Sequence, residues 1–169
     1  MSKLSTRRDV AKLAVAAGIG ITAEIAIGPA SAADATEVQT AFLFDLTLTT
    51  LPRTEIGSDR TVVGVSAGTF DGPRLKGKVI GPAGDWIVQR RDGSRLLDVR
   101  ALLQTDDAQH IYVTWRGVAY TPPGGALYAR ILPMFETGAA KYAWLNNVVA
   151  IGLYRPMEGK IVYRVYQIL

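Results

Sequence analysis

Residues 95–117 read RLLDVRALLQTDDAQHIYVTWRG, and apolar and polar side chains alternate in both halves of this stretch. In the first half Leu97 is followed by Asp98, and the alternation continues for several residues. Successive side chains of a strand point to opposite faces, so a period of two indicates a β-strand with one buried face. A short polar segment with two aspartates, which are common in turns, separates the halves. The stretch therefore predicts an antiparallel hairpin with strands at 95–105 and 110–117.

The same alternation continues from Val38 to the C-terminus, and clusters of Gly, Pro, Asp or Asn interrupt it about every ten residues. Short alternating runs with regular turn signals are typical of all-β domains, and no stretch shows a sustained helical period. The predicted strands span residues 39–50, 61–70, 75–80, 85–90, 95–105, 110–117, 128–136, 144–154 and 160–168.

About nine mostly antiparallel strands must either stack as a sandwich or close into a barrel, and closure removes the exposed edges. We favour a single closed or nearly closed antiparallel β-barrel of about eight to ten strands. Several strands carry polar and large aromatic side chains on one face and aliphatic ones on the other. If the polar face lines the interior, the barrel has a cavity for one small ligand. The alternative is that the polar faces meet water outside a packed core.

The first 32 residues have the features of a targeting segment. Arg7 and Arg8 lie in the sequence TRRDVAK, which resembles the twin-arginine export signal. A weakly apolar stretch too short to span a bilayer follows, and it ends in an A-x-A cleavage signature at 30–32. We therefore expect a signal peptide at 1–32 and a β-barrel domain at 33–169. The protein would be exported by the twin-arginine machinery to the periplasm or outside a bacterial cell, without a stable membrane anchor after cleavage.

The composition of the 169 residues excludes several kinds of chemistry. The chain has no cysteine and a single histidine, so disulfides, thiolate catalysis and cysteine or poly-histidine metal sites are excluded. With 49% hydrophobic and 20% charged residues it is typical of one globular domain. The net charge of +4 falls to +2 when residues 1–32 are removed, because they carry four basic and two acidic side chains. We find no basic stripe with interleaved aromatics and expect no nucleic-acid partner.

Residues 64–68 match G-x-S-x-G, the pattern of the nucleophile elbow in α/β-hydrolases. That elbow requires a strand, a sharp turn and a helix in a parallel-sheet domain. Here the pattern continues into a predicted strand and turn, so we interpret Gly64 and Gly68 as bulge or close-packing positions.

Five segments along the β-rich part of the chain carry a further signal, and they span residues 68–77, 84–86, 97–100, 106–112 and 135–146. They read GTFDGPRLKG, GDW, LDVR, DDAQHIY and FETGAAKYAWLN. In this order they resemble the bacterial and fungal family catalogued as domain of unknown function 3237. The resemblance implies a small lipocalin-like or allene-oxide-cyclase-like β-barrel, and most members have no assigned activity. The twin-arginine segment is a departure from the family pattern.

Eight side chains in these segments are candidate site residues, because folds seldom bury a charge or a polar group without a partner or a use. A carboxylate desolvated beside aromatic walls can act as general acid or base, and Asp98 or Glu136 would have this role. Arg100, together with Asn146, would bind an oxygen anion that develops on the substrate. The expected substrate-binding residues are Asp85, Trp86, Tyr112, Trp144 and Asn146. In the alternative interpretation, an internal Asp–Arg pair and amide hydrogen bonds only fix the strand register.

These residues suit a cofactor-free lyase or isomerase that acts on a small apolar or aromatic molecule, without a metal. The reactions would be isomerisation, cyclisation, or the addition and loss of water or alcohol. The alternative is a non-catalytic, lipocalin-like binding or carrier protein of the cell envelope. A third possibility is an interaction protein whose barrel has no cavity. A homodimer is the statistical default for its assembly.

Overall fold

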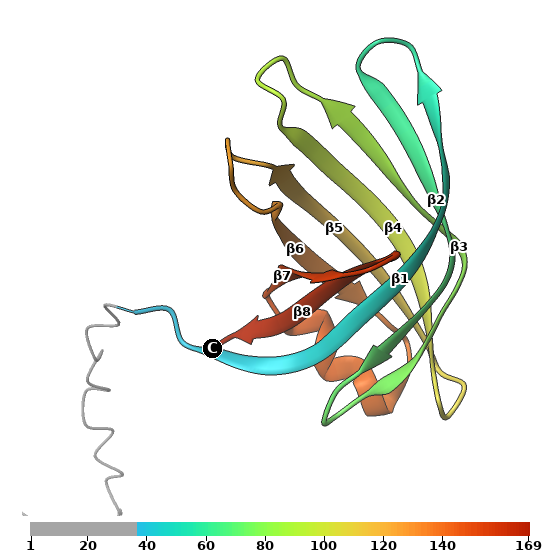
Figure 1. Ribbon diagram of the computed structural model, residues 1–169. Helices are drawn as coiled ribbons and strands as arrows, with labels where there is room; N and C mark the ends of the chain where they lie inside the picture. The colour runs from blue at the N-terminus through green and yellow to red at the C-terminus, as the bar shows by residue number, and fades with distance from the viewer. Residues whose placement is uncertain (1–36) are drawn as a thin grey trace, which may run out of the picture. The chain divides into compact units, whose positions relative to one another are not determined.

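The computed structural model describes residues 37–169, which form a closed antiparallel β-barrel (Figure 1). Each strand pairs with its neighbours in sequence, and the last strand pairs with the first. The elements are β1 (Thr40–Ile56), β2 (Arg60–Asp71), β3 (Lys76–Gln89), β4 (Arg95–Thr105), β5 (His110–Tyr120), β6 (Tyr128–Glu136), the 3-10 helix η1 (Ala140–Asn147), β7 (Ala150–Met157) and β8 (Lys160–Ile168). The predicted all-β barrel is confirmed, with eight strands. The targeting segment expected at 1–32 lies outside the described residues.

Strand β3 corrects one expectation from the sequence, because the strands predicted at 75–80 and 85–90 are one continuous strand. The Gly81-Pro82 step between them lies at a shift of register against β4 rather than in a turn. Proline has no N–H to donate to a ladder, so it is found at irregular positions of a sheet. Pairing between β2 and β3 shifts between Gly64 and Gly68, which confirms the interpretation of these glycines as bulge positions.

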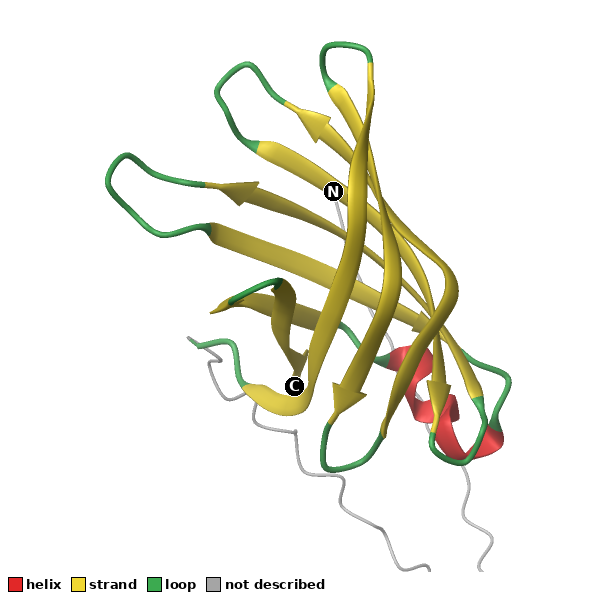
Figure 2. Ribbon diagram, turned by 45° about the vertical axis from the view of Figure 1, so that its right-hand side comes forward, coloured by secondary structure: helices red, strands yellow, loops and turns green. Residues whose placement is uncertain are grey.

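Helix η1 corrects a second expectation, because residues 144–147 were predicted to begin a strand and are helical instead. The helix has eight residues, and its buried side chains, Tyr142 and Leu145, are three positions apart. This spacing matches the three residues per turn of a 3-10 helix. Figure 2 shows η1 at the end of the barrel opposite the β1–β2 and β3–β4 hairpins. Within residues 37–169, no helix is long and apolar enough to cross a bilayer.

The half of the barrel next to η1 is solidly packed. The ring of Phe44 lies edge-on to Phe70 and Phe135, with centroid separations of 5.8 and 6.0 Å. Leu103, Ile111 and Leu145 are fully buried there. Edge-to-face aromatic pairs add to the stabilisation that burial itself provides. This end of the barrel therefore supplies the hydrophobic core, and the opposite end is left to form a site.

The seam between β6 and β7 is short, since the two strands pair at Arg130 with Leu153 and at Ile131 with Gly152. Ile131 is completely buried, and its side chain fills the space over Gly152. At the other seam, between β1 and β8, Arg164 donates two hydrogen bonds to Asp45, both 2.8 Å long. Packing closes one seam of the barrel, and an extended ladder with an ion pair closes the other.

Candidate active site

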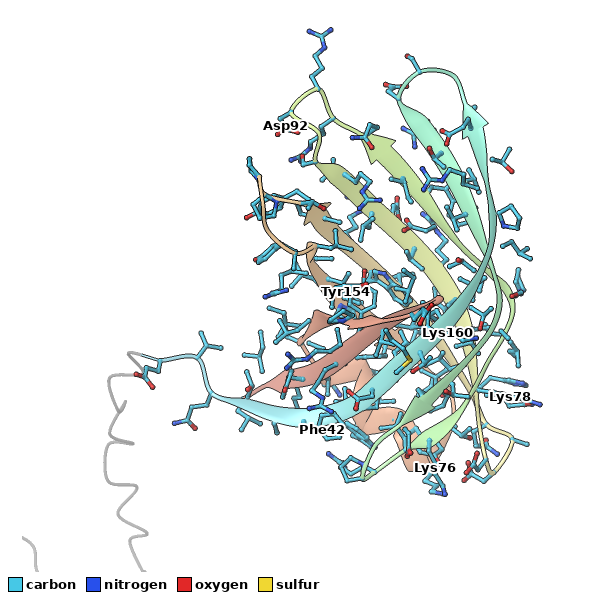
Figure 3. All side chains as sticks on the ribbon, viewed as in Figure 1. Phe42, Lys76, Lys78, Asp92, Tyr154 and Lys160 are labelled. Carbon is cyan, nitrogen blue, oxygen red and sulfur yellow. The ribbon has the colours of Figure 1, made fainter. Side chains whose placement is uncertain are left out.

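A cavity of about 620 Å³ occupies the half of the barrel away from η1. It opens between the β1–β2 hairpin, the β3–β4 loop and the β5–β6 loop. Figure 3 shows Asp92 of the β3–β4 loop at this end of the barrel and Lys76 at the opposite end. The volume is within the usual range for small-molecule sites. The aliphatic part of its wall includes Leu48, Val63, Val65, Ile87, Leu97, Val99, Leu127 and Ile161.

Among the side chains with hydrogen-bonding groups in the cavity wall, five come from five different strands. They are Asp85 of β3, Arg95 of β4, Trp115 of β5, Tyr154 of β7 and Tyr163 of β8. The period of two explains their direction, because each shares a strand face with buried or cavity-lining apolar neighbours. In β4, for example, Arg95 is on the same face as Leu97 and Val99. The fold therefore brings polar side chains from separate strands together with aliphatic ones in the wall of one cavity.

Asp85 is the carboxyl group of this cavity. Its Oδ1 accepts a 3.0 Å hydrogen bond from the backbone N–H of Asp98, and among residues 37–169 no donor contacts its other oxygen. Burial raises the pKa of Asp85 to about 6, and the charge of Asp98 acts in the same direction. The hydrogen bond and the charge of Arg95 oppose this rise. Near neutral pH such a group can both accept and return a proton.

Tyr163 and Tyr154 lie beside each other in the cavity wall, with ring centroids 6.1 Å apart in an edge-to-face arrangement. Tyr163 is buried, and burial raises the pKa of its hydroxyl, as do the neighbouring Asp85 and Tyr154. The hydroxyl therefore stays protonated and can donate a hydrogen bond at any working pH. In the described part of the chain, neither tyrosine hydroxyl has a hydrogen-bond partner.

Trp115 adds an unsatisfied donor to the same wall. Its indole Nε1–H is the one fully buried side-chain polar group without a partner in the part of the chain that the structure describes. Leaving a buried donor unpaired costs about 1–3 kcal/mol. Asp85, the two tyrosines and Trp115 therefore have hydrogen-bonding capacity that the described protein itself does not use.

Asp98 and Arg100 lie on the outer face of β4, where their side chains form a 3.5 Å ion pair. Both are substantially exposed, and the guanidinium of Arg100 is 5.5 Å from the ring of Trp86, also on the outside. The structure thus corrects the expectation that these three residues face the interior. The aliphatic face of β4 turns inward instead, because burying Leu97 and Val99 is more favourable than burying the charged pair.

Tyr112 and Glu136 are paired across β5 and β6 and are also exposed on the outer wall. Here the alternative interpretation of the sequence, in which the polar faces meet water, is the arrangement observed. Trp144 and Asn146 lie in η1, at the packed end of the barrel opposite the cavity opening, which we call the closed end. Trp144 packs beneath the guanidinium of Arg74, whose Cζ is 3.5 Å from the ring centroid.

The side chain of Asn146 forms hydrogen bonds with the backbone of Thr137, in the segment just before η1. Its Oδ1 accepts the backbone N–H of Thr137 at 2.9 Å, and its Nδ2 donates to the carbonyl oxygen of Thr137 at 3.0 Å. This pair of bonds matches the alternative in which an amide fixes local structure. Of the eight predicted site residues, Asp85 therefore lines the cavity and the other seven do not.

A smaller hollow of about 240 Å³ lies at the closed end, next to Asp107. Asp107 accepts hydrogen bonds from Lys141 Nζ at 2.6 Å, Thr105 Oγ1 at 2.6 Å and Tyr142 Oη at 2.9 Å. These donors hold the pKa of Asp107 well below its usual range. The carboxylate is fully used in holding η1 against the β4–β5 turn. Across residues 37–169, no three acidic or histidine side chains gather as metal ligands.

Comparison with known proteins places this barrel in a family. The family model described as protein of unknown function (DUF3237) matches residues 37–168. A UPF0311 protein from Clostridium acetobutylicum is 26% identical over 144 residues, which cover 75% of this chain and 91% of the relative. A hydroalkoxylation enzyme from Penicillium herquei is 34% identical over 119 residues, which cover 66% of this chain and 70% of the enzyme.

The solved structures agree with the fold. A β-barrel-like protein from Acinetobacter baumannii has a TM-score of 0.72 and 28% identity, covering 79% of this chain and 97% of the other. The likeness therefore extends over the barrel as a whole. Because the family model also spans nearly all of the described residues, the chain belongs to the family described as protein of unknown function (DUF3237).

Proposed function

We propose that the barrel is an enzyme that moves a proton on a small apolar or aromatic molecule, with Asp85 as general acid and base. One observation carries the proposal: a carboxyl group with an unused oxygen lies in the wall of the barrel cavity, and its pKa is raised to about 6. A proton carrier is most effective when its pKa is near the working pH, and it contributes about 10²–10⁴-fold to the rate. Asp85 therefore replaces Asp98 and Glu136 as the candidate general acid or base, because those two residues lie outside the cavity.

The reaction class that we propose is the addition of an alcohol or phenol across a conjugated double bond. It is supported by the relative from Penicillium herquei, which is named a hydroalkoxylation enzyme. Asp85 takes the hydroxyl proton while the oxygen forms a bond to the far carbon of an unsaturated ketone. The electron pair of the double bond moves onto the ketone oxygen as an enolate. Asp85 then returns the proton to the adjacent carbon, so atoms and charge balance.

Tyr163 has the complementary role in this proposal. Its hydroxyl is protonated and reaches the same cavity as Asp85, whose charge affects its pKa. A preorganised donor aimed at a developing oxyanion lowers the barrier more than it stabilises the neutral substrate. Tyr163 would therefore donate a hydrogen bond to the enolate oxygen.

The test compares Asp85→Asn with Asp98→Asn, which removes the neighbouring carboxylate on the outer wall. Cyclisation of 2′-hydroxychalcone and other hydroxyaryl enones is followed by absorbance. We expect Asp85→Asn to lose about 100-fold or more in kcat and Asp98→Asn to keep most activity. An Asp85→Asn variant as active as the parent would refute the assignment.

A second function, a non-catalytic carrier, is favoured by the aliphatic side chains in the cavity wall and by the open end of the barrel. A carrier needs a binding site but no proton transfer. In that case ligand affinity would survive Asp85→Asn, and none of the enones would be turned over.

We also propose that the protein acts outside the bacterial cytoplasm, because residues 1–32 resemble a twin-arginine signal. Fractionation of cells that express the full chain with a C-terminal tag tests this. We expect a shortened protein in the periplasm or medium, and retention in the cytoplasm when Arg7 and Arg8 are both changed to lysine. Equal export of both proteins would contradict the proposal.

A further inference from the structure

Arg95 is the one positively charged side chain on the inner face of β4, and no side-chain hydrogen bond or ion pair to it exists within residues 37–169. We infer that Arg95 is the anchor for an anionic group, such as a carboxylate, on the molecule that binds in the cavity. The inference deepens the proposed function, on whose use of the cavity as a binding site it rests, by naming the substrate class.

No carboxylate among residues 37–169 forms an ion pair with Arg95, although its charge acts at longer range on Asp85. Across the strands it pairs with Gln89 of β3 and Ala119 of β5, neither of which carries a negative charge. In the adjoining loop, Oδ1 of Asp92 accepts hydrogen bonds from the N–H of Ser94 at 2.9 Å and from its hydroxyl at 2.7 Å, and Asp92 forms no ion pair with Arg95. A half-buried guanidinium without a partner is costly, and its fork of donors suits a carboxylate. A bound anion would satisfy it.

The position of Arg95 sets an orientation for the ligand. Asp85 pairs with Val99, whereas Arg95 is four residues nearer the opening along β4. Four residues of strand span about 13 Å, which the extended Arg95 side chain shortens. The charge of Arg95 nonetheless acts on both Asp85 and Tyr163. A molecule that contacts both residues therefore has its reacting part deep in the cavity and its anion nearer the opening.

The charge around the opening favours entry of such a molecule. Three segments border it, residues 53–60, 89–95 and 120–128, and they carry five basic but three acidic side chains. The basic ones are Arg53, Arg60, Arg90, Arg91 and Arg95. An excess of one sign around a low-dielectric cleft attracts ligands of the opposite sign and raises their association rate. Arg53 also lines the outermost part of the cavity.

Two fluorescent dyes with the same ring system test the inference. 1-Anilinonaphthalene-8-sulfonate carries an anion, and N-phenyl-1-naphthylamine is its uncharged counterpart. Arg95→Met keeps the apolar stem and removes the charge. We expect it to weaken sulfonate binding about tenfold or more, and to change the affinity for the neutral dye less than about twofold. Arg116→Met, exposed on the outer face of β5 and not on the cavity wall, is the matched control and should change neither.

Competition between the two dyes establishes that they share the cavity. Equal losses for both dyes in Arg95→Met would mean that the side chain acts through packing, and no loss for either would mean that it binds no anion. Each outcome overturns the inference. Because dye binding needs no turnover, an active Asp85→Asn variant would refute the proposed chemistry while leaving a sulfonate-selective Arg95 intact.

Discussion

The backbone N–H of Asp98 donates a hydrogen bond to Oδ1 of Asp85 at 3.0 Å, so the strand that carries the outer aspartate also orients the inner one. The bond comes from the main chain, and replacing the Asp98 side chain leaves it in place. Asp85 keeps one oxygen fixed and the other turned to the cavity. This relationship makes the pair a matched set for mutational tests.

The pH dependence of turnover follows from the raised pKa of Asp85, about 6. Only the carboxylate form can take the first proton, so kcat/KM for 2′-hydroxychalcone should rise with pH and level off above about 6. The rate is measured between pH 4.5 and 7.5, below the ionisation range of the phenol. Asp85→Asn should abolish this inflection, and an inflection that persists in the variant would contradict the assignment.

Stability should change with pH in the opposite direction. The folded-state pKa of Asp85 is raised from 3.8 to about 6, so the folded protein binds the proton more tightly than the unfolded chain does. The free energy of unfolding is therefore largest below pH 3.8. It falls by up to about 3 kcal/mol as the pH rises to about 6, because the folded protein then loses its advantage in binding the proton. Asp85→Asn should raise the midpoint of urea unfolding at pH 7.5 relative to the parent. A variant that is less stable at that pH would show that the burial cost is offset by other interactions.

Tyr163→Phe tests the oxyanion donor. The change removes one hydroxyl and keeps the ring that packs on Tyr154. We expect kcat to fall about tenfold or more, with little change in the affinity for the neutral dye. Tyr166→Phe, on β8 but not on the cavity wall, is the control. If both variants were equally active, Tyr163 would have only a packing role.

The barrel wall itself is tested by Gly117→Ala. A Cβ at Gly117 would collide with the carbonyl oxygen of Arg130, on the neighbouring strand. Overpacking of this kind destabilises by about 1–3 kcal/mol. Nothing lies within 4 Å of a Cβ built at Gly138, so Gly138→Ala should be close to neutral. Chemical denaturation of the two variants gives the comparison, and equal stabilities would mean that β5 and β6 can separate slightly at no cost.

The all-β barrel follows from the alternation in the sequence, and that same alternation indicates which face of β4 is inside. Aliphatic side chains fill the inner face, so the phase of Leu97 and Val99 also places Arg95 in the cavity and Asp98 outside. Reading the polar face as the inner one reversed this assignment. The cavity of a barrel needs only a few polar groups, and the rest of its wall obeys the rule for any core.

Other parts of the site have no such signal. The irregular pairing of β3 around Gly81 and Pro82 breaks the period of two, so no continuous alternation extends to Asp85 from the start of the strand. Helix η1 is too short for a helical period to stand out. The partners of Tyr163 come from strands far apart in sequence, and their proximity depends on closure of the barrel.

The separation between a packed half and a hollow half has a consequence for how such a protein can change over generations. Phe44, Leu145 and their neighbours hold the barrel together without contributing to the cavity. Substitutions near the opening can therefore alter which molecules fit while the foundation of the fold is untouched. New specificities would be acquired most readily at the rim, and the end beside η1 would resist change.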